Sequence, residues 1–202
     1  MKHTRLSITF FALGVLCIVS ALGLFFYNRF TADKAYEVSQ DTVSQLTELI
    51  EQEEPGIFPT DNVEREMPKT KVDGNGYIGY LNITEYDLKL PVSAEINYDI
   101  LNISPCLYSG SVYSNDMVVA AHNYEYHFGK IPYLPIGSVI TFTDVENNKY
   151  EYQVISIETL GPTQIEEMIT KTIVNNWDLT LFTCNYGGSQ RIAVRCMRTA
   201  ES

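Results

Sequence analysis

The chain has 202 residues, and its 14 Lys and Arg stand against 25 Asp and Glu, a formal net charge of −11. This acidic balance argues against a nucleic-acid-binding protein, whose affinity depends on clustered cationic side chains. Hydrophobic residues make up 45% of the chain, so it can bury a core and is not disordered. The length fits one domain with appended segments, or one domain and a membrane segment.

An uncharged apolar segment lies near the N-terminus, at residues 6–26. A helix of this length spans roughly 30 Å, the thickness of the hydrocarbon core of a bilayer. Lys2 and Arg5 precede the segment, and Arg29 and Lys34 follow it, so charge alone does not decide its orientation. The short basic N-terminus and the long polar remainder favour a single-pass anchor with the N-terminus inside.

A cleaved signal peptide is the alternative interpretation of this segment. Val19-Ser20-Ala21 resembles a small-residue cleavage site. Because the apolar run continues to Phe26 and exceeds an ordinary signal-peptide core, we favour the uncleaved anchor.

The segment between the anchor and residue 72 is predicted to be a stalk and a linker. A narrow apolar stripe on an otherwise polar helix is formed by Tyr36, Val43, Leu46 and Ile50. We expect a solvated helix that lifts the following domain off the membrane. An acidic linker with little structure follows, containing Pro55, Gly56, Pro59, Asp61, Glu64, Glu66 and Pro68. The predicted organisation is therefore 1–5 N-terminus, 6–26 anchor, 27–72 stalk and linker, and 73–202 folded domain.

Short strands separated by turn residues occupy the folded domain. They are predicted at Tyr77–Ile83, Lys89–Val92, Met117–Ala121, Val139–Thr143, Lys149–Ile157, Leu179–Cys184 and Gln190–Cys196. One short helix is expected, with Thr163 and Glu166 as a capping box. Its apolar face would be Ile165, Met168, Ile169 and Ile173. Seven or so short strands with one or two helices predict a mainly β fold, a closed or nearly closed barrel.

The clearest chemical signal is the strand that ends in Cys184. A six-residue loop separates it from Arg191, which opens the next strand. A connection of this length suits an antiparallel hairpin that places Cys184 beside Arg191. Arg195 shares the strand face of Arg191 but lies about 13 Å further along. We therefore expect Arg195 to be a surface charge.

A catalytic cysteine needs a partner that manages its proton and later protonates a leaving amine. Three cysteines lie outside the apolar segment, and this odd number favours a free thiol. His122 directly follows the strand Met117–Ala121, where a strand end delivers a side chain to the rim of a barrel. His127 lies within a loop and is more typical of a polar loop residue. We therefore choose His122 as the partner of Cys184.

At this point the chain resembles the sortase family. Thr180-Leu181-Phe182-Thr183-Cys184 is similar to the family's Thr-Leu-x-Thr-Cys, with Arg191 downstream and His122 upstream. Similar segments are also found at Val118–His122, Phe128-Gly129, Gly79–Leu81 and Leu90–Val92. The resemblance extends over about residues 76–197.

The resemblance implies a cysteine transpeptidase on an eight-stranded β-barrel, outside the membrane of a Gram-positive cell. Cys184 would attack a Thr–Gly-type bond in the C-terminal sorting signal of a surface protein, and an amine of a peptidoglycan precursor or of another protein would resolve the thioacyl enzyme. His122 would act as general acid and then base. Arg191 would donate hydrogen bonds to the oxyanion or to the substrate backbone. Thr183 would position substrate or form a local hydrogen bond.

The resemblance leaves the subclass and the resting protonation state open. Only 62 positions separate His122 from Cys184 (184 − 122), and the short connection before the cysteine strand disfavours class B, which carries a longer helix there. Glu54-Pro55-Gly56 replaces the Asp-Pro-aromatic lid of the pilus-building class C, and the chain ends without a second span, so class C is also disfavoured. Arg191 favours a thiolate and burial opposes it, so an ion pair and a neutral pair both remain compatible.

Other functions remain compatible with the sequence. One is a pilin polymerase or a thiol peptidase of the same fold, and another is a non-catalytic surface-binding domain with a structural Cys184. No cofactor is expected; acidic loops could hold calcium, but no residue spacing specifies a metal site. The residues expected to pack in the core are Cys106, Tyr150, Tyr152 and Cys196, and Trp177 is expected to be a core residue or a loop anchor.

Overall fold

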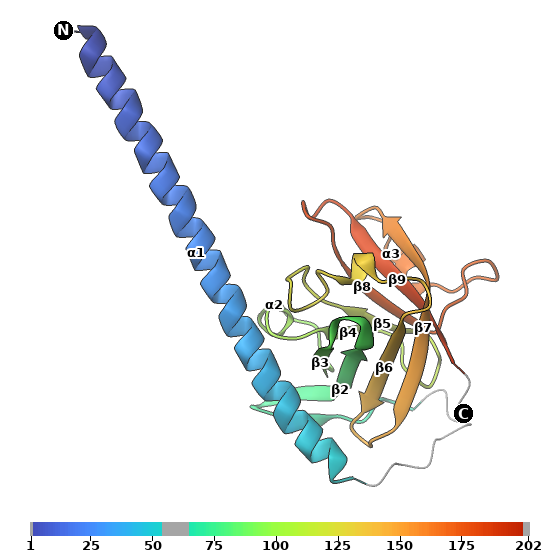
Figure 1. The fold of residues 1–202 in the computed structure, drawn as a ribbon. Helices are drawn as coiled ribbons and strands as arrows, with labels where there is room; N and C mark the ends of the chain where they lie inside the picture. Colours follow the sequence, from blue (N-terminus) through green and yellow to red (C-terminus); the bar gives the residue numbers. More distant parts are fainter. Residues whose placement is uncertain (1, 54–64, 200–202) are drawn as a thin grey trace. The chain divides into compact units, whose positions relative to one another are not determined.

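The computed structural model describes residues 2–53 and 65–199, with side chains described from residue 10 onward (Figure 1). Residues 54–64, which contain most of the predicted acidic linker and Glu54-Pro55-Gly56, lie outside the described residues. The chain divides into two compact units, residues 1–37 and 38–202. Helix α1 (Lys2–Glu51) contributes to both.

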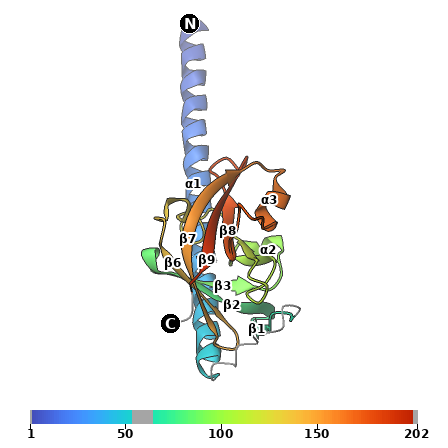
Figure 2. The same cartoon turned by 90° about the vertical axis from the view of Figure 1, so that its right-hand side faces the viewer.

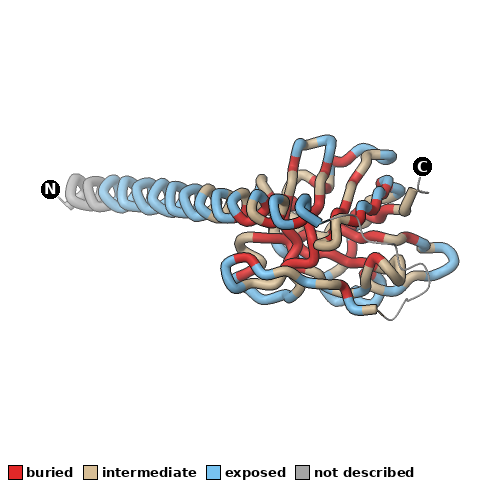
Figure 3. The backbone as a smooth tube through the Cα atoms, turned by 90° about the horizontal axis from the view of Figure 1, so that it is seen from below, coloured by how far each residue is buried: buried red, intermediate tan, exposed pale blue. Residues whose placement is uncertain are grey.

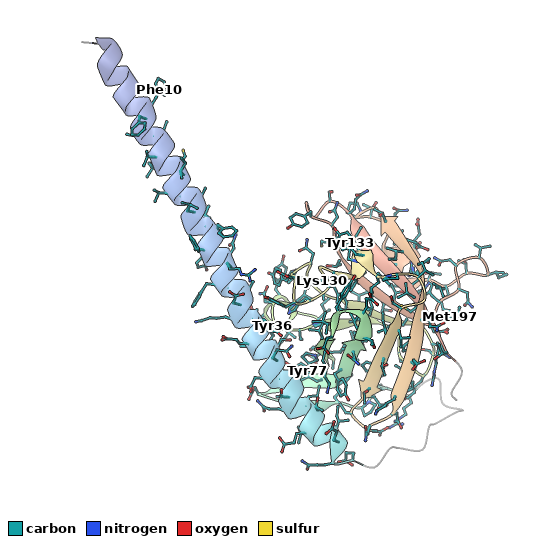
Figure 4. All side chains as sticks on the ribbon, viewed as in Figure 1. Phe10, Tyr36, Tyr77, Lys130, Tyr133 and Met197 are labelled. Atoms are coloured by element: carbon teal, nitrogen blue, oxygen red, sulfur yellow. The ribbon has the colours of Figure 1, made fainter. Side chains whose placement is uncertain are left out.

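The first unit is the apolar part of α1. Its large hydrophobic side chains are exposed, and Phe10 projects from the helix in Figure 4. Among the described residues, α1 is the one helix that is long and apolar enough to cross a membrane by length and composition. A signal sequence near the N-terminus passes the same test of length and composition.

The end of α1 belongs to the second unit and packs on its sheet. Val43, Leu46 and Ile50 are buried in a cluster with Val72 and Tyr77. Figure 4 shows Tyr77 beside this part of α1. The prediction of a solvated stalk is therefore wrong for these residues, because an apolar surface of the sheet is available to cover the stripe.

The second unit is a closed β-barrel (Figure 2). Its strands are β1 (Thr70–Val72), β2 (Asn75–Ile83), β3 (Leu88–Ser93), β4 (Cys106–Ser109), β5 (Met117–Ala120), β6 (Val139–Asp144), β7 (Lys149–Leu160), β8 (Leu179–Cys184) and β9 (Arg191–Arg198). They are ordered β1-β2-β3-β4-β5-β8-β9-β7-β6, and an additional β2–β6 pairing closes the ring. Eight strands therefore form the barrel, as the resemblance implied, and β1 extends β2 outside the ring.

The strand predictions agree with the structure to within a few residues, except that β1 and β4 were missed. Both are short, and β4 joins β3 through a single residue pair. The described helices besides α1 are also short. They are α2 (Tyr98–Leu101), α3 (Ile165–Ile169) and two 3₁₀ turns, η1 (Thr84–Tyr86) and η2 (Ile131–Tyr133).

The predicted capping box of α3 is wrong. Gln164 occupies the N-cap position, without a side-chain hydrogen bond to the helix. Its Oε1 instead accepts a hydrogen bond from the backbone N–H of Gly161. Of the expected apolar face, Met168 is buried, whereas Ile165 and Ile173 are exposed. A helix of five residues is too short to present the longer stripe that the sequence suggested.

The barrel interior is filled by apolar side chains. Figure 3 colours the backbone of all buried residues red. Tyr150, Tyr152 and Cys196 lie in this core, as predicted. Trp177 is buried in a smaller cluster on the outer side of β8 and β9, with Ala193 and other residues.

Gly79 allows the ring to close. Its φ is +150°, and a Cβ at this position would lie 2.0 Å from the carbonyl oxygen of Thr143 on β6. Only a residue without a side chain permits β2 to approach β6 so closely.

Candidate active site

The β8–β9 hairpin brings Cys184 and Arg191 together. The two residues are directly paired at the loop end of the hairpin, which confirms the sequence prediction. Cys184 is a free, partly exposed thiol. The antiparallel register thus places a thiol and a guanidinium at the same rim of the barrel.

The parallel pairing of β5 with β8 brings His122 to the same rim. Ala120 is paired with Phe182, and the backbone N–H of Ala121 donates to the carbonyl of Phe182. His122 and Cys184 each follow two residues after this pair. Because parallel strands end at the same edge of a sheet, both side chains emerge together.

A tight loop holds His122 in place. The N–H of Phe128 donates to the carbonyl of His122, and the N–H of Gly129 donates to that of Tyr124. A Cβ on Gly129 would lie 2.6 Å from the Tyr124 oxygen. Asn123 joins this loop to the one after Cys184, since its Nδ2 donates to the carbonyl of Asn185 at 3.3 Å.

Two aromatic rings flank His122, which is partly exposed. Its ring centroid lies 4.9 Å from that of Tyr124 and 6.2 Å from that of Tyr98. Its Nε2 is buried and has no hydrogen-bond partner in the described chain. Burial lowers the pKa of His122 below the ordinary 6.5, so the imidazole is mostly neutral at pH 7. The structure therefore favours a neutral histidine at rest.

His127 lies behind Tyr124 and is only 1% exposed. Its ring centroid is 5.6 Å from that of Tyr124. Burial, and secondarily the nearby His122, lowers the pKa of His127 to about 4. It is thus a neutral, buried loop residue, where the sequence suggested a polar one, and it does not line the cavity described next.

A cavity of about 290 Å³ opens at this rim. His122, Cys184 and Arg191 all line it. Its remaining wall is mostly apolar and consists of Ile96, Tyr98, Leu101, Tyr108, Ala120, Ala121, Gly161, Pro162, Gln164, Ile165, Met168 and Phe182. One cavity is therefore lined by a candidate nucleophile (Cys184), a side chain that can carry a proton (His122) and a fixed cation (Arg191).

The guanidinium of Arg191 is oriented by its own loop. Its Nη1 donates to the carbonyls of Gly188, at 3.0 Å, and Gln190, at 3.2 Å. Arginine has five N–H donors, and no other nitrogen of Arg191 makes a hydrogen bond within the described residues. Donors therefore remain available to a ligand in the cavity.

The family model for the sortase domain matches residues 81–199, more than half of the chain. The chain belongs to the sortase family. Sortases are cysteine transpeptidases, and membership supports that activity here. A search of curated proteins finds no match.

Several solved sortase structures resemble this sortase. Sortase C1 of Streptococcus agalactiae is 26% identical over 65% of this chain and 72% of that chain, with a TM-score of 0.54. Sortase C of Clostridium perfringens SM101 is 24% identical over 84% and 96%, with a TM-score of 0.52. The Clostridium perfringens sortase D5 transpeptidase is 15% identical over 81% and 99%, with a TM-score of 0.60. The last two show the fold alone. Because sortases named C and D both match, the subclass stays a prediction.

Thr183 does not line the cavity. It alternates with Cys184 along β8 and is buried, and its Oγ1 makes no hydrogen bond within the described residues. The structure therefore gives no support to the expected contact between Thr183 and substrate.

The prediction that Arg195 is a surface charge is wrong. Its side chain is fully buried, and its Nε lies 3.3 Å from Oε2 of Glu158. The α3 segment and Trp177 cover the outer face of β9 at this point. The alternation along the strand predicted the correct face for Arg195, but it did not predict that α3 and Trp177 cover this face.

The other two thiols of the barrel are buried, as predicted. Burial raises the pKa of Cys106 to about 12 and raises that of Cys196. Both therefore remain protonated at neutral pH. No group of three or more His, Cys, Asp or Glu side chains that could hold a metal ion occurs within the described residues.

Proposed function

We propose that this sortase is a membrane-anchored transpeptidase. It cleaves the C-terminal sorting signal of surface proteins at Cys184 and transfers the acyl group to an amine. The observation that carries the proposal is the shared cavity of Cys184, His122 and Arg191 at one rim of the barrel.

Acylation begins with a neutral His122. The imidazole takes the proton of the Cys184 thiol as the sulfur attacks the scissile carbonyl carbon, and the peptide C–N bond then breaks. The imidazolium gives this proton to the departing amine, so that a thioester and a free C-terminal fragment remain. Arg191 donates to the oxyanion that forms in between, or to the neighbouring substrate backbone.

Transfer reverses the proton path. An incoming amine attacks the thioester carbonyl and gives a proton to His122, a new amide forms, and the proton returns to the sulfur of Cys184. The apolar walls of the cavity support this outcome, since Phe182, Tyr108 and Met168 limit the access of water around the acyl group.

The anchor completes the proposal. Residues 6–26 span the membrane with the N-terminus inside, and the barrel acts outside the cell. The acceptor is then an amine of a peptidoglycan precursor, which is made available at the same surface.

Intact-mass spectrometry of the full-length protein in detergent micelles tests the proposal. The protein is incubated with a panel of sorting-signal peptides, beside Cys184→Ala, His122→Ala and the buried-thiol control Cys106→Ala. We expect the wild type and Cys106→Ala to gain the mass of the N-terminal peptide fragment. Cys184→Ala should form no adduct, and His122→Ala should be acylated far more slowly.

The resolution of the adduct separates the alternatives. Faster loss of the thioester with an added glycine-peptide amine than with water supports the transpeptidase. Loss to water alone supports a thiol peptidase, and preferred resolution by a lysine side chain of another protein supports a pilin polymerase. The absence of any adduct across the panel contradicts the proposal and favours a binding domain.

A further inference from the structure

Arg195 is a fully buried cation whose guanidinium makes four hydrogen bonds. Its Nη1 donates to the carbonyl of Met168 and to Oγ1 of Thr180, both at 2.8 Å, and its Nη2 donates to the carbonyl of Glu167 at 2.6 Å. Its Nε bonds Glu158 at 3.3 Å. Four hydrogen bonds from one guanidinium thus converge on three different segments of the chain.

These bonds fix the C-terminal end of α3. The last carbonyls of a helix have no partner within the helix, and those of Glu167 and Met168 are satisfied by Arg195. The Trp177 ring lies 4.9 Å below the guanidinium carbon and closes the site from the other side. Glu158 supplies the opposite charge. Arg195 therefore joins α3 to β8 and β9.

The segment that Arg195 holds is one wall of the cavity. Gln164, Ile165 and Met168 all line it together with Cys184. Met168 contributes its side chain to this wall and its carbonyl to Arg195. It is also the buried residue of α3, and it packs with Trp177 while Ile169 contacts the same cluster, so the bonds of Arg195 add to one small apolar contact of the helix.

We propose that Arg195 is a positioning residue that sets the depth of the peptide-binding cavity by fixing α3 against β8 and β9. The inference rests on the proposed function, since it assigns the α3 wall to the peptide substrate. Arg195 does not touch the reacting atoms. It acts through α3, and its loss changes how peptide binds while the thiol remains reactive toward small molecules.

Substitution by lysine tests the geometry without removing the charge. A lysine ammonium is a point charge on a flexible stem and cannot reproduce the planar fork that reaches four acceptors. Thr180→Val removes one acceptor of the same guanidinium and keeps the side-chain shape. Arg198→Lys is the matched control, because this arginine lies on the same strand and contacts Asn115 and Tyr150.

The experiment uses the full-length protein in micelles and compares three readouts. They are the kcat and KM of acylation by the best peptide of the panel, the rate of Cys184 alkylation by iodoacetamide, and hydrogen exchange of residues 164–170.

For Arg195→Lys we expect KM to rise roughly tenfold with a smaller change in kcat. Alkylation should stay within about twofold of wild type. Amide exchange should become faster in 164–170 and not in β5. Thr180→Val should follow the same pattern with a smaller rise, and Arg198→Lys should match wild type.

Three results would overturn the inference. The first is an unchanged KM in Arg195→Lys, and the second is unchanged exchange of 164–170. The third is an equal fall in acylation and alkylation, which would indicate a general structural role. If no peptide acylates the wild type, the proposed function fails by itself. The exchange readout still decides whether Arg195 holds α3.

Discussion

The β8–β9 hairpin has two register pairs that place an arginine opposite a polar side chain of the neighbouring strand. At the rim, Cys184 faces Arg191; four residues deeper, Thr180 faces Arg195. The rim pair borders a cavity and leaves donors of Arg191 available. In the deeper pair, the guanidinium is fully buried and bonds to Thr180 itself.

The difference shows that environment, and not strand position, assigns the roles of the two arginines. Both side chains lie on the same face of β9, because residues four positions apart on a strand point to the same side. At the rim, an open cavity leaves donors of the cation available to a ligand. Deeper down, α3 and Trp177 cover the strand, and the same side chain becomes part of the fold.

The deeper arginine should have the larger effect on stability. We expect Arg195→Met to lower the free energy of unfolding by about 3 kcal/mol, because it leaves the buried carbonyl of Met168 and the buried hydroxyl of Thr180 without their donor and removes the ion pair with the partly exposed Glu158. Arg191→Met should stay within about 0.5 kcal/mol of wild type. Urea unfolding of both variants checks this, and equal losses would remove the distinction between the two ends of the hairpin.

The rim arginine should have the larger effect on chemistry. Removing the donors of Arg191 in Arg191→Gln should lower kcat/KM for peptide acylation roughly 100-fold, the usual cost of losing a donor to an oxyanion. Stability should be nearly unchanged. Quenching the acylation reaction at intervals and measuring the adduct by mass spectrometry gives the rate, with Arg198→Gln as the control. A decrease in kcat/KM of less than about threefold would contradict an oxyanion or backbone role for Arg191.

The contrast between rim and interior also separates the two histidines of the loop. The pKa of His127 is about 4 in the fold and about 6.5 when unfolded. The unfolded chain therefore takes up this proton first as pH falls. The stability that neutral His127 contributes is complete above pH 6.5, falls by about 2 kcal/mol by pH 5, and is lost progressively toward pH 4.

Urea unfolding at pH 7 and pH 5 tests this difference with His127→Phe, which retains a ring and removes the titration. We expect the variant to lose about 2 kcal/mol less than wild type between the two conditions. Parallel losses in the two proteins would show that His127 is already protonated in the fold or is not buried.

The smallest expected effect concerns the bridge between the two rim loops. Asn123→Ala removes the hydrogen bond to the carbonyl of Asn185 and should slow peptide acylation about fivefold, the value of one neutral hydrogen bond. Glu125→Gln, in the same loop, is the control and should stay near wild type. An acylation rate equal to that of wild type would show that the loops hold their positions without this bridge.

Local patterns in the sequence predicted the features that depend on neighbouring residues. The hairpin pairing of Cys184 with Arg191 follows from loop length, and the place of His122 follows from the strand before it. The burial of Arg195 could not be predicted in this way, because the residues that cover it belong to α3 and to Trp177, 18 or more positions away along the chain. The partner of the α1 stripe is equally remote, since Val43 meets Val72 and Tyr77 only in the folded unit.

The parallel pairing of β5 with β8 has a consequence for biogenesis. The two strands lie about sixty residues apart in the chain and meet only after β6 and β7 have been made and folded over. Pairings between such distant segments form late and slowly in folding. The thiol and the imidazole therefore come together only as the barrel is completed, and a partly folded chain lacks the assembled pair that we propose as catalytic.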